Sequence, residues 1–261
     1  KRLLEYDDVM NQQREVIYKK RRYALFGDRL SVEISNMFFD TCDSIVSTYF
    51  DSKDFSNFEL DLMKFLSIQA PIDEEDFKNI EKNELTDLVY KSCYENYKLK
   101  SEIIAQSTFP VIENVYKSHS GHYKNIVIPF SDGVKTMNVV TNLEEAYESK
   151  GENIQFSIEK SITLSIIDDI WKEHLREMDD LKQSVQNAVY EQKDPLLIYK
   201  FESFDLFKTM LDKVNKEIIS FLIKSNLPNQ SNVQQEQIQK QQNLQTSRPE
   251  LAAPNKVNTP N

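Results

Sequence analysis

The reactive side chains of this sequence are few, and their spacing argues against catalysis. Asp7 and Asp8 form a carboxylate pair, but neighbouring residues on a helix point about 100° apart, so they are not placed as an acid/base dyad. His119 and His122 have no cysteine or third histidine nearby to complete a metal site. We therefore expect no catalytic residue and no zinc site here, and interpret the histidine pair as part of a polar loop.

The remaining histidine and the cysteines also favour structural roles. His174 lies on an apolar stripe without a second metal ligand four residues away on that face, which favours a packed or hydrogen-bonded core histidine. Cys42 and Cys93 are too few for a disulfide framework or a cysteine-type zinc site. We expect both to be small buried hydrophobes in a reducing compartment.

Composition excludes two further classes of function. Only 4 of the 261 residues are glycine, whereas average usage is about 7%, and neither G-x-x-x-x-G-K-[ST] nor G-x-G-x-x-G occurs. We therefore expect a mainly α fold that binds no nucleotide or other cofactor within this chain. A net charge of −10 disfavours nucleic-acid binding, which needs a basic face.

One basic run stands against this acidic background. Lys19-Lys20-Arg21-Arg22 closes the first expected helix, where each cation favours the helix C-terminus by about 0.3–1 kcal/mol. A second interpretation is contact with anionic lipid headgroups. A third, a nucleic-acid-binding helical domain, rests on this run alone.

Apolar periodicity predicts helices through the first part of the chain. Gly27 is placed to cap the first helix and Asp73 to begin a later one, after the break at Pro71. In the second helix we expect the apolar side to comprise Val32, Met37, Phe38, Ile45 and Tyr49. The predicted helices cover 1–26, 31–50, 58–69 and 74–109.

Residues 111–150 have a different pattern. Two β-rich runs, 123–130 and 134–141, flank Ser131-Asp132-Gly133, which predicts a hairpin. Asn142 and Glu145 resemble a capping box for a short helix.

From about residue 155 the helical pattern returns as two seams, meaning apolar stripes that each face a partner helix. Asp194-Pro195 marks the start of the second helix, and a short loop between the helices predicts an antiparallel pair. The Gln- and Asn-rich stretch 228–261 is expected to be a disordered linker. The first seam comprises Leu164, Ile167, Trp171, His174, Met178, Leu181 and Val185, and the second Phe204, Phe207, Leu211, Val214, Ile218 and Phe221.

Three strings carry a family resemblance. DDIWKEHLREMDDLKQSV followed by YEQKDPLLIYKFESFDLF resembles the two-helix finger of the SecA family, the motor ATPases of bacterial preprotein translocation. KRLLEYDDVMNQQREVIY resembles the end of that family's scaffold helix. The resemblance implies a helical scaffold end at 1–30, a helical wing domain at 31–153 and a finger at 154–227. It also implies that 111–153 is a hairpin-bearing insertion of a Bacteroidetes-like kind.

The resemblance further implies a mechanical role. ATP and magnesium would bind to nucleotide-binding domains outside this chain, so the chain itself should not hydrolyse ATP. The implied partners are those domains, where Asp7 and Asp8 would dock, an unfolded preprotein and the SecYEG channel. The implied location is cytoplasmic, peripheral at the inner face of the plasma membrane. The fingertip residues that would contact preprotein or channel are Tyr190, Gln192, Lys193, Asp194 and Pro195.

Some positions depart from the family pattern. Ala188 and Val189 stand where many members have Arg-Gly, so no role of that arginine transfers. The family's C-x-C…C-H zinc motif is absent from the sequence, so either this member lacks it or the motif lies beyond residue 261. Periodicity alone also leaves open a non-enzymatic helical scaffold or adaptor protein.

Overall fold

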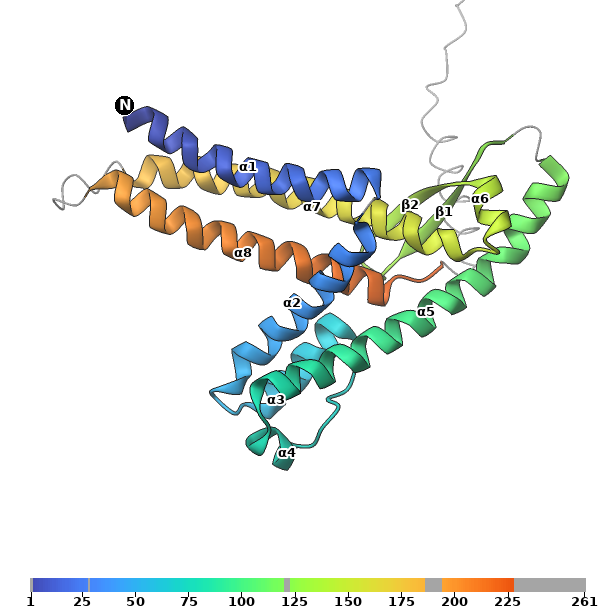
Figure 1. Ribbon diagram of the computed structural model, residues 1–261, viewed down its shortest axis with the longest axis horizontal. Helices are drawn as coiled ribbons and strands as arrows, with labels where there is room; N and C mark the ends of the chain where they lie inside the picture. Colours follow the sequence, from blue (N-terminus) through green and yellow to red (C-terminus); the bar gives the residue numbers. More distant parts are fainter. Residues whose placement is uncertain (1, 28, 120–122, 186–193, 228–261) are drawn as a thin grey trace, which may run out of the picture. The chain divides into compact units, whose positions relative to one another are not determined.

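The computed structural model describes residues 2–27, 29–119, 123–185 and 194–227. Lys1–Asn226 form one compact unit, which holds every described helix and strand. Its described part is mainly α-helical, with one two-stranded antiparallel sheet (Figure 1), which confirms the predicted fold class. None of the described helices is long and apolar enough to cross a membrane.

Helix α1 (Arg2–Phe26) ends at Gly27, as predicted. The Gly27 N–H donates to the Tyr23 carbonyl at 2.9 Å, and its φ of +78° suits glycine. A Cβ here would also lie 2.5 Å from the ring of Phe156. The expected capping by the basic run is wrong, because the last turn of α1 contains no basic residue and Lys19–Arg22 lie one turn earlier.

Helix α2 (Leu30–Phe50) buries Met37, Phe38 and Ile45, as expected. Val32 was assigned to the same side but is 57% exposed. The buried face includes Ile34. Side chains two positions apart in a helix point about 200° apart around its axis. Val32 therefore points away from the core.

The next two predicted helices are divided differently in the structure. The helix expected over 58–69 is α3 (Phe55–Asp61) followed by a π-helical turn, η1 (Leu62–Leu66). The helix expected over 74–109 is two helices, α4 (Glu74–Asn79) and α5 (Lys82–His119), because Ile80 is extended. Asp73 caps α4 as predicted, its carboxylate accepting the Asp76 N–H at 2.9 Å.

Helix α5 also continues beyond its predicted end, with Pro110 inside it. An interior proline costs about 3 kcal/mol through the lost hydrogen bond and a steric clash. Packing on both sides of the proline offsets this cost. Phe109 and Tyr116 stack on Tyr147 of α6 (Leu143–Glu148), with ring centroids 6.2 and 4.1 Å apart.

The predicted hairpin is formed by β1 (Asn125–Ser131) and β2 (Thr136–Asn142). The second strand begins two residues later than expected, because the Asp132 carboxylate holds the N–H groups of Val134 and Lys135 in the turn. Asn142 caps α6 by accepting the N–H groups of Glu144 and Glu145. The inner face of the sheet is buried, and β2 packs against α7. The buried residues of the sheet are Ile128, Phe130, Val139 and Thr141.

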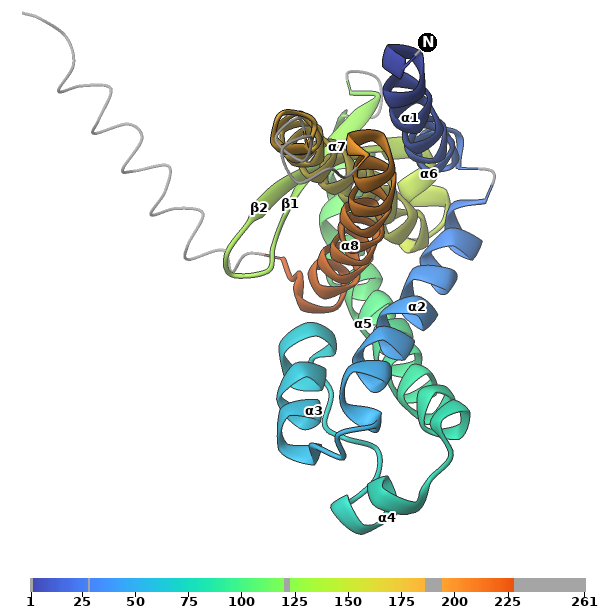
Figure 2. The ribbon, with the colours of Figure 1, turned by 90° about the vertical axis from the view of Figure 1, so that its left-hand side faces the viewer.

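Helices α7 (Glu152–Ser184) and α8 (Pro195–Lys224) lie side by side, and α1 packs along both of them (Figures 1 and 2). Asp194 caps α8, accepting the Leu196 N–H at 3.0 Å, and Pro195 takes the first helical position. Beyond α8, Asn226 exchanges two backbone hydrogen bonds with Ser131, of 3.0 and 2.8 Å. This bridge ties the end of α8 to β1.

The seams are buried unevenly. On α7, Leu164 and Trp171 are half-buried and the other five predicted positions are buried. On α8, Val214, Ile218 and Phe221 are buried, and Phe207 and Leu211 are half-buried. Phe204 is 66% exposed, so its assignment to the seam is wrong. α8 packs against α1 and α2 as well as α7, so its buried face is not a two-stranded seam. Tyr199, Ser203 and Met210 are buried instead.

The correction at Phe204 gives a direct test. Leu181→Ala should lower the free energy of unfolding by about 2–5 kcal/mol, because Leu181 is only 6% exposed. Phe204→Ala removes a larger side chain but should cost less than about 0.5 kcal/mol. Urea unfolding of this chain, followed by circular dichroism, measures both. Equal losses would show that Phe204 is buried.

Candidate functional site

Three helices meet at a buried polar contact. We call Gln13 of α1, His174 of α7 and Ser203 of α8 the finger joint. Their exposed fractions are 6%, 1% and 0%. The Gln13 Nε2 donates to the Ser203 carbonyl at 3.0 Å, and the Gln13 Oε1 lies 2.9 Å from the His174 Nε2. One amide side chain therefore bonds both α7 and α8 to α1.

The amide orientation determines which histidine nitrogen carries the proton. Because the Gln13 nitrogen donates to a carbonyl, the Gln13 oxygen must accept, and the His174 Nε2 must be its donor. Burial lowers the pKa of His174 to about 4, so the ring is neutral at pH 7. Its Nδ1 makes no hydrogen bond within the described residues, and the Glu177 Oε2 is 3.9 Å away.

Aromatic rings enclose this imidazole. The centroids of Trp171 and Phe207 lie 5.4 and 5.7 Å from that of His174. His174 is thus the hydrogen-bonded core histidine that the sequence predicted. Across the part of the chain that the structure describes, no three His, Cys, Asp or Glu side chains are grouped as metal ligands. The side chains of His119 and His122 lie outside the described residues.

Gln13 and Ser203 were not among the predicted site residues. A signal for Gln13 was present, because it lies between Met10 and Ile17 at spacings of three and four. That spacing places a polar residue in line with the apolar stripe of α1. Ser203 contributes a backbone carbonyl, which its residue type does not reveal.

Ion pairs near the end of α1 link this helix to α7 and α2. Arg21 makes two bonds to Asp168 of α7, at 2.6 and 2.9 Å, and Asp168 raises the pKa of Arg21. Lys20 lies 3.4 Å from Glu33 of α2. Lys20 and Arg21 therefore hold α1 to its neighbours, whereas Lys19 and Arg22 lie near the rings of Tyr23 and Phe26 of α1 itself.

Asp7 and Asp8, which are adjacent in α1, line different grooves. This arrangement agrees with the expectation that they do not form an acid/base dyad. Asp7 lies 3.8 Å from Lys182 of α7 and lines a groove between α1 and α7. Asp8 lines the groove between α1 and α8, together with Lys200 and Phe204. Exposed pairs of this kind are worth about 0–1 kcal/mol each.

Near the start of α8, α1 also shares a core with α7 and α8. The rings of Tyr6 and Tyr199 lie 4.7 Å apart. Asp194 and Pro195 are described at the start of α8, whereas Tyr190, Gln192 and Lys193 fall outside the described residues. The buried cluster consists of Met178, Leu181, Val185 and Tyr199, with Tyr6, Val9, Met10, Ile198 and Leu206 packed against it.

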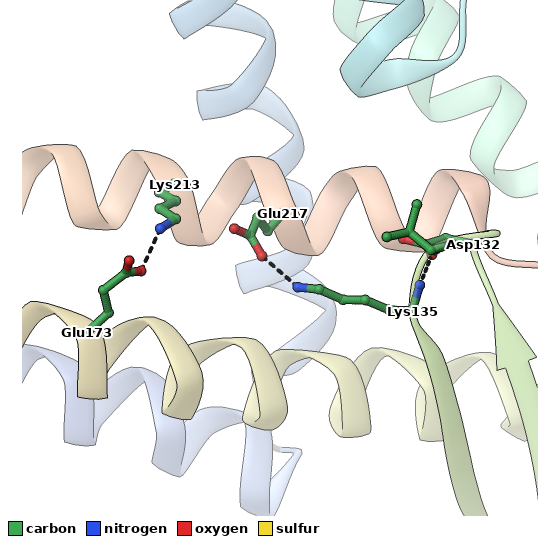
Figure 3. A network of polar contacts seen from close by, with 6 residues as sticks. Asp132, Lys135, Glu173, Lys213 and Glu217 are labelled. Carbon is green, nitrogen blue, oxygen red and sulfur yellow. Dashed lines mark hydrogen bonds and ion pairs between the residues drawn. The ribbon is translucent and has the colours of Figure 1, made fainter.

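The other end of α8 is held by polar contacts (Figure 3). Lys213 lies 2.6 Å from Glu173 of α7, and Lys135 of the hairpin turn lies 3.0 Å from Glu217. Lys100 of α5 donates to the Ile223 carbonyl, and burial lowers the pKa of that lysine to about 8. The C-terminal half of α8 is therefore fixed to the hairpin, to α7 and to α5.

The start of α8 carries an exposed apolar stripe. Leu197, Phe201 and Phe204 are 55%, 67% and 66% exposed. They follow one another at spacings of four and three, so they share one face of the helix. This stripe begins two residues after the proline that starts α8.

Residues 1–226, which include the finger joint, match the family model of the SecA Wing and Scaffold domain. The chain belongs to the SecA family. It is 54% identical over 253 residues to the protein translocase subunit SecA of Flavobacterium psychrophilum, covering 96% of this chain and 23% of that protein. It is 55% identical over 228 residues to the protein translocase subunit SecA of Christiangramia forsetii, and the match covers 87% of this chain and 20% of that protein.

A third relative is the protein translocase subunit SecA of Porphyromonas gingivalis, 42% identical over 245 residues, covering 94% of this chain and 22% of that protein. The family match and these identities confirm the predicted SecA resemblance, and all three relatives come from Bacteroidetes, as predicted. The chain spans about a fifth of the length of these SecA relatives.

The buried imidazole predicts a pH dependence of stability. The unfolded chain binds a proton near pH 6.5 and the folded chain only near pH 4. Above pH 6.5 the free energy of unfolding therefore loses nothing through this group. As the pH is lowered, the free energy of unfolding falls, by about 3 kcal/mol at pH 4. His174→Gln cannot titrate. Urea unfolding at several pH values should show a shallower decline between pH 6.5 and 4 for this variant. Parallel curves for the two proteins would contradict the assignment.

Proposed function

We propose that this chain is the scaffold, wing and finger part of a protein translocase subunit that moves preproteins. The support is the family match over residues 1–226 and the name of the relatives, protein translocase subunit SecA. The alternative, a non-enzymatic helical scaffold or adaptor, has only the helical periodicity in its favour.

The proposed mechanism is mechanical. ATP and magnesium bind to nucleotide-binding domains outside this chain, and α1 transmits their movement to the finger. The observation that carries this proposal is the attachment of α1 to both finger helices by one buried amide. Because α7 and α8 also pack along each other, displacement of α1 would move the finger as a unit.

The proposed point of action is the fingertip, at the mouth of the SecYEG channel. Tyr190, Gln192 and Lys193, together with Asp194 and Pro195, would meet the unfolded preprotein there. An aromatic ring can pack against many side-chain types, which suits a changing substrate. The exposed stripe of Leu197, Phe201 and Phe204 offers further apolar surface beside the tip.

We further propose a cytoplasmic location, peripheral at the inner face of the plasma membrane. Lys19 and Arg22 are exposed beside Tyr18 and Phe26, a combination suited to anionic lipid headgroups. Asp7 and Asp8, both exposed on α1, are proposed to dock against the nucleotide-binding domains.

A substitution at the tip tests the proposed point of action. In the full-length protein, Tyr190→Ala should lower preprotein transport into SecYEG vesicles more than it lowers ATP hydrolysis, because the hydrolytic site lies in other domains. Tyr190→Phe keeps the ring and should be milder. The measurement is transport per ATP hydrolysed for the three proteins.

The control is Tyr123→Ala, an exposed tyrosine outside the finger. This variant should keep the wild-type ratio of transport to hydrolysis. A wild-type ratio in Tyr190→Ala would remove Tyr190 from the mechanism.

A further inference from the structure

We propose that the finger joint fixes the register of α1 along the finger, and that Gln13 and His174 are the positioning residues through which movement of α1 reaches α7 and α8. The register role stands on the structure of this chain alone. The coupling role rests on the proposed function.

The hydrogen bonds of the joint allow one arrangement. If the Gln13 amide were flipped, its oxygen would face the Ser203 carbonyl. That contact would be repulsive with either tautomer of His174, because acceptor would meet acceptor. The observed geometry, with bonds of 2.9 and 3.0 Å, satisfies both neighbours at once.

Sliding of α1 would break this arrangement. One helical turn is about 5.4 Å, and the neighbours of Gln13 along its stripe are the apolar Met10 and Ile17. A slip of one turn would place an apolar side chain against the His174 N–H and leave the Gln13 amide without its partners. Each buried unpaired group costs about 1–3 kcal/mol. An apolar stripe alone lacks this penalty, so the polar joint selects the register.

The imidazole depends on α1 for its only hydrogen bond within the described residues. Its Nδ1 has none, and the rings of Trp171 and Phe207 confine it from α7 and α8. The outer contacts of α1, such as Arg21 with Asp168 and Lys200 with Glu5, are exposed to solvent. Exposed pairs are weak and can form again in a neighbouring register. The buried joint is therefore the contact least tolerant of displacement.

The structural test measures the distance between α1 and α7 in this chain. The buried Cys42 and Cys93 are first replaced by alanine. Spin labels are then attached at Glu15→Cys and Arg176→Cys, both exposed positions. Pulsed electron paramagnetic resonance measures the distance between the two labels. The wild-type joint should give one narrow distance distribution. The double variant Gln13→Leu with His174→Leu replaces both partners by apolar groups, which is often nearly neutral for stability. It should remain folded and give a broadened or shifted distribution.

The matched control is Gln12→Leu, the same chemical change at the exposed neighbouring position, which should keep the narrow distribution. His174→Gln places a donor where Nε2 lies and should also keep it. A narrow, unshifted distribution in the folded double variant would overturn the register proposal. A His174→Gln variant as broad as the double variant would overturn the role of the hydrogen bond.

The coupling test uses the full-length protein with the same variants. Transport per ATP hydrolysed should fall about fivefold or more in the double variant, and change less than about twofold in His174→Gln and Gln12→Leu. An unchanged ratio in the double variant would overturn the coupling role. If Tyr190→Ala still lowered transport in that case, the proposed function itself would stand and only this inference would fail.

Discussion

The buried hydrogen bonds from Gln13 to His174 and to the Ser203 carbonyl are the constraint on which the arrangement of α1, α7 and α8 depends. Apolar packing brings these helices together without choosing how far one is displaced along another. A buried amide and a buried imidazole must each find partners. Only one displacement supplies them, so a small polar contact decides the position of a 25-residue helix.

The contacts around the joint follow from that position. With α1 in this register, Tyr6 meets Tyr199 towards the tip and Arg21 meets Asp168 towards the base. The end of α8 is also held by α5, through Lys100 and the Ile223 carbonyl, and by the hairpin, through Ser131 and Asn226. The start of α8 is held to α1 instead, through Tyr199 and Tyr6 and through Lys200 and Glu5, and it also exposes an apolar stripe. The helix pair α7 and α8 is therefore fixed to the hairpin and to α5 at one end, and it exposes apolar side chains at the start of α8.

The SecA-family match also suggests why α8 exposes apolar residues, which the composition did not explain. Phe204 looks like a core residue when the sequence is read as a pair of seams, because it lies three residues before Phe207. In the structure the neighbouring Ser203 is buried and Phe204 lines the groove beside α1. An exposed phenylalanine in this place is suited to contact with a partner, in line with the proposed preprotein contact.

The sequence by itself determined the features that depend on local interactions: the helical fold class, the hairpin, and the caps at Gly27, Asp73, Asn142 and Asp194. A cap needs only a side chain or a backbone conformation within a few residues, so its signal is complete in the sequence. The family resemblance was likewise carried by contiguous strings. Only the tertiary structure decided that α5 continues through Pro110, because Tyr147 supplies the compensating packing. It also decided the faces of α2 and α8, since these depend on which helices surround them. The finger joint was decided there too, because Gln13 and Ser203 are 190 residues apart, and no local pattern states which distant carbonyl a buried amide will find.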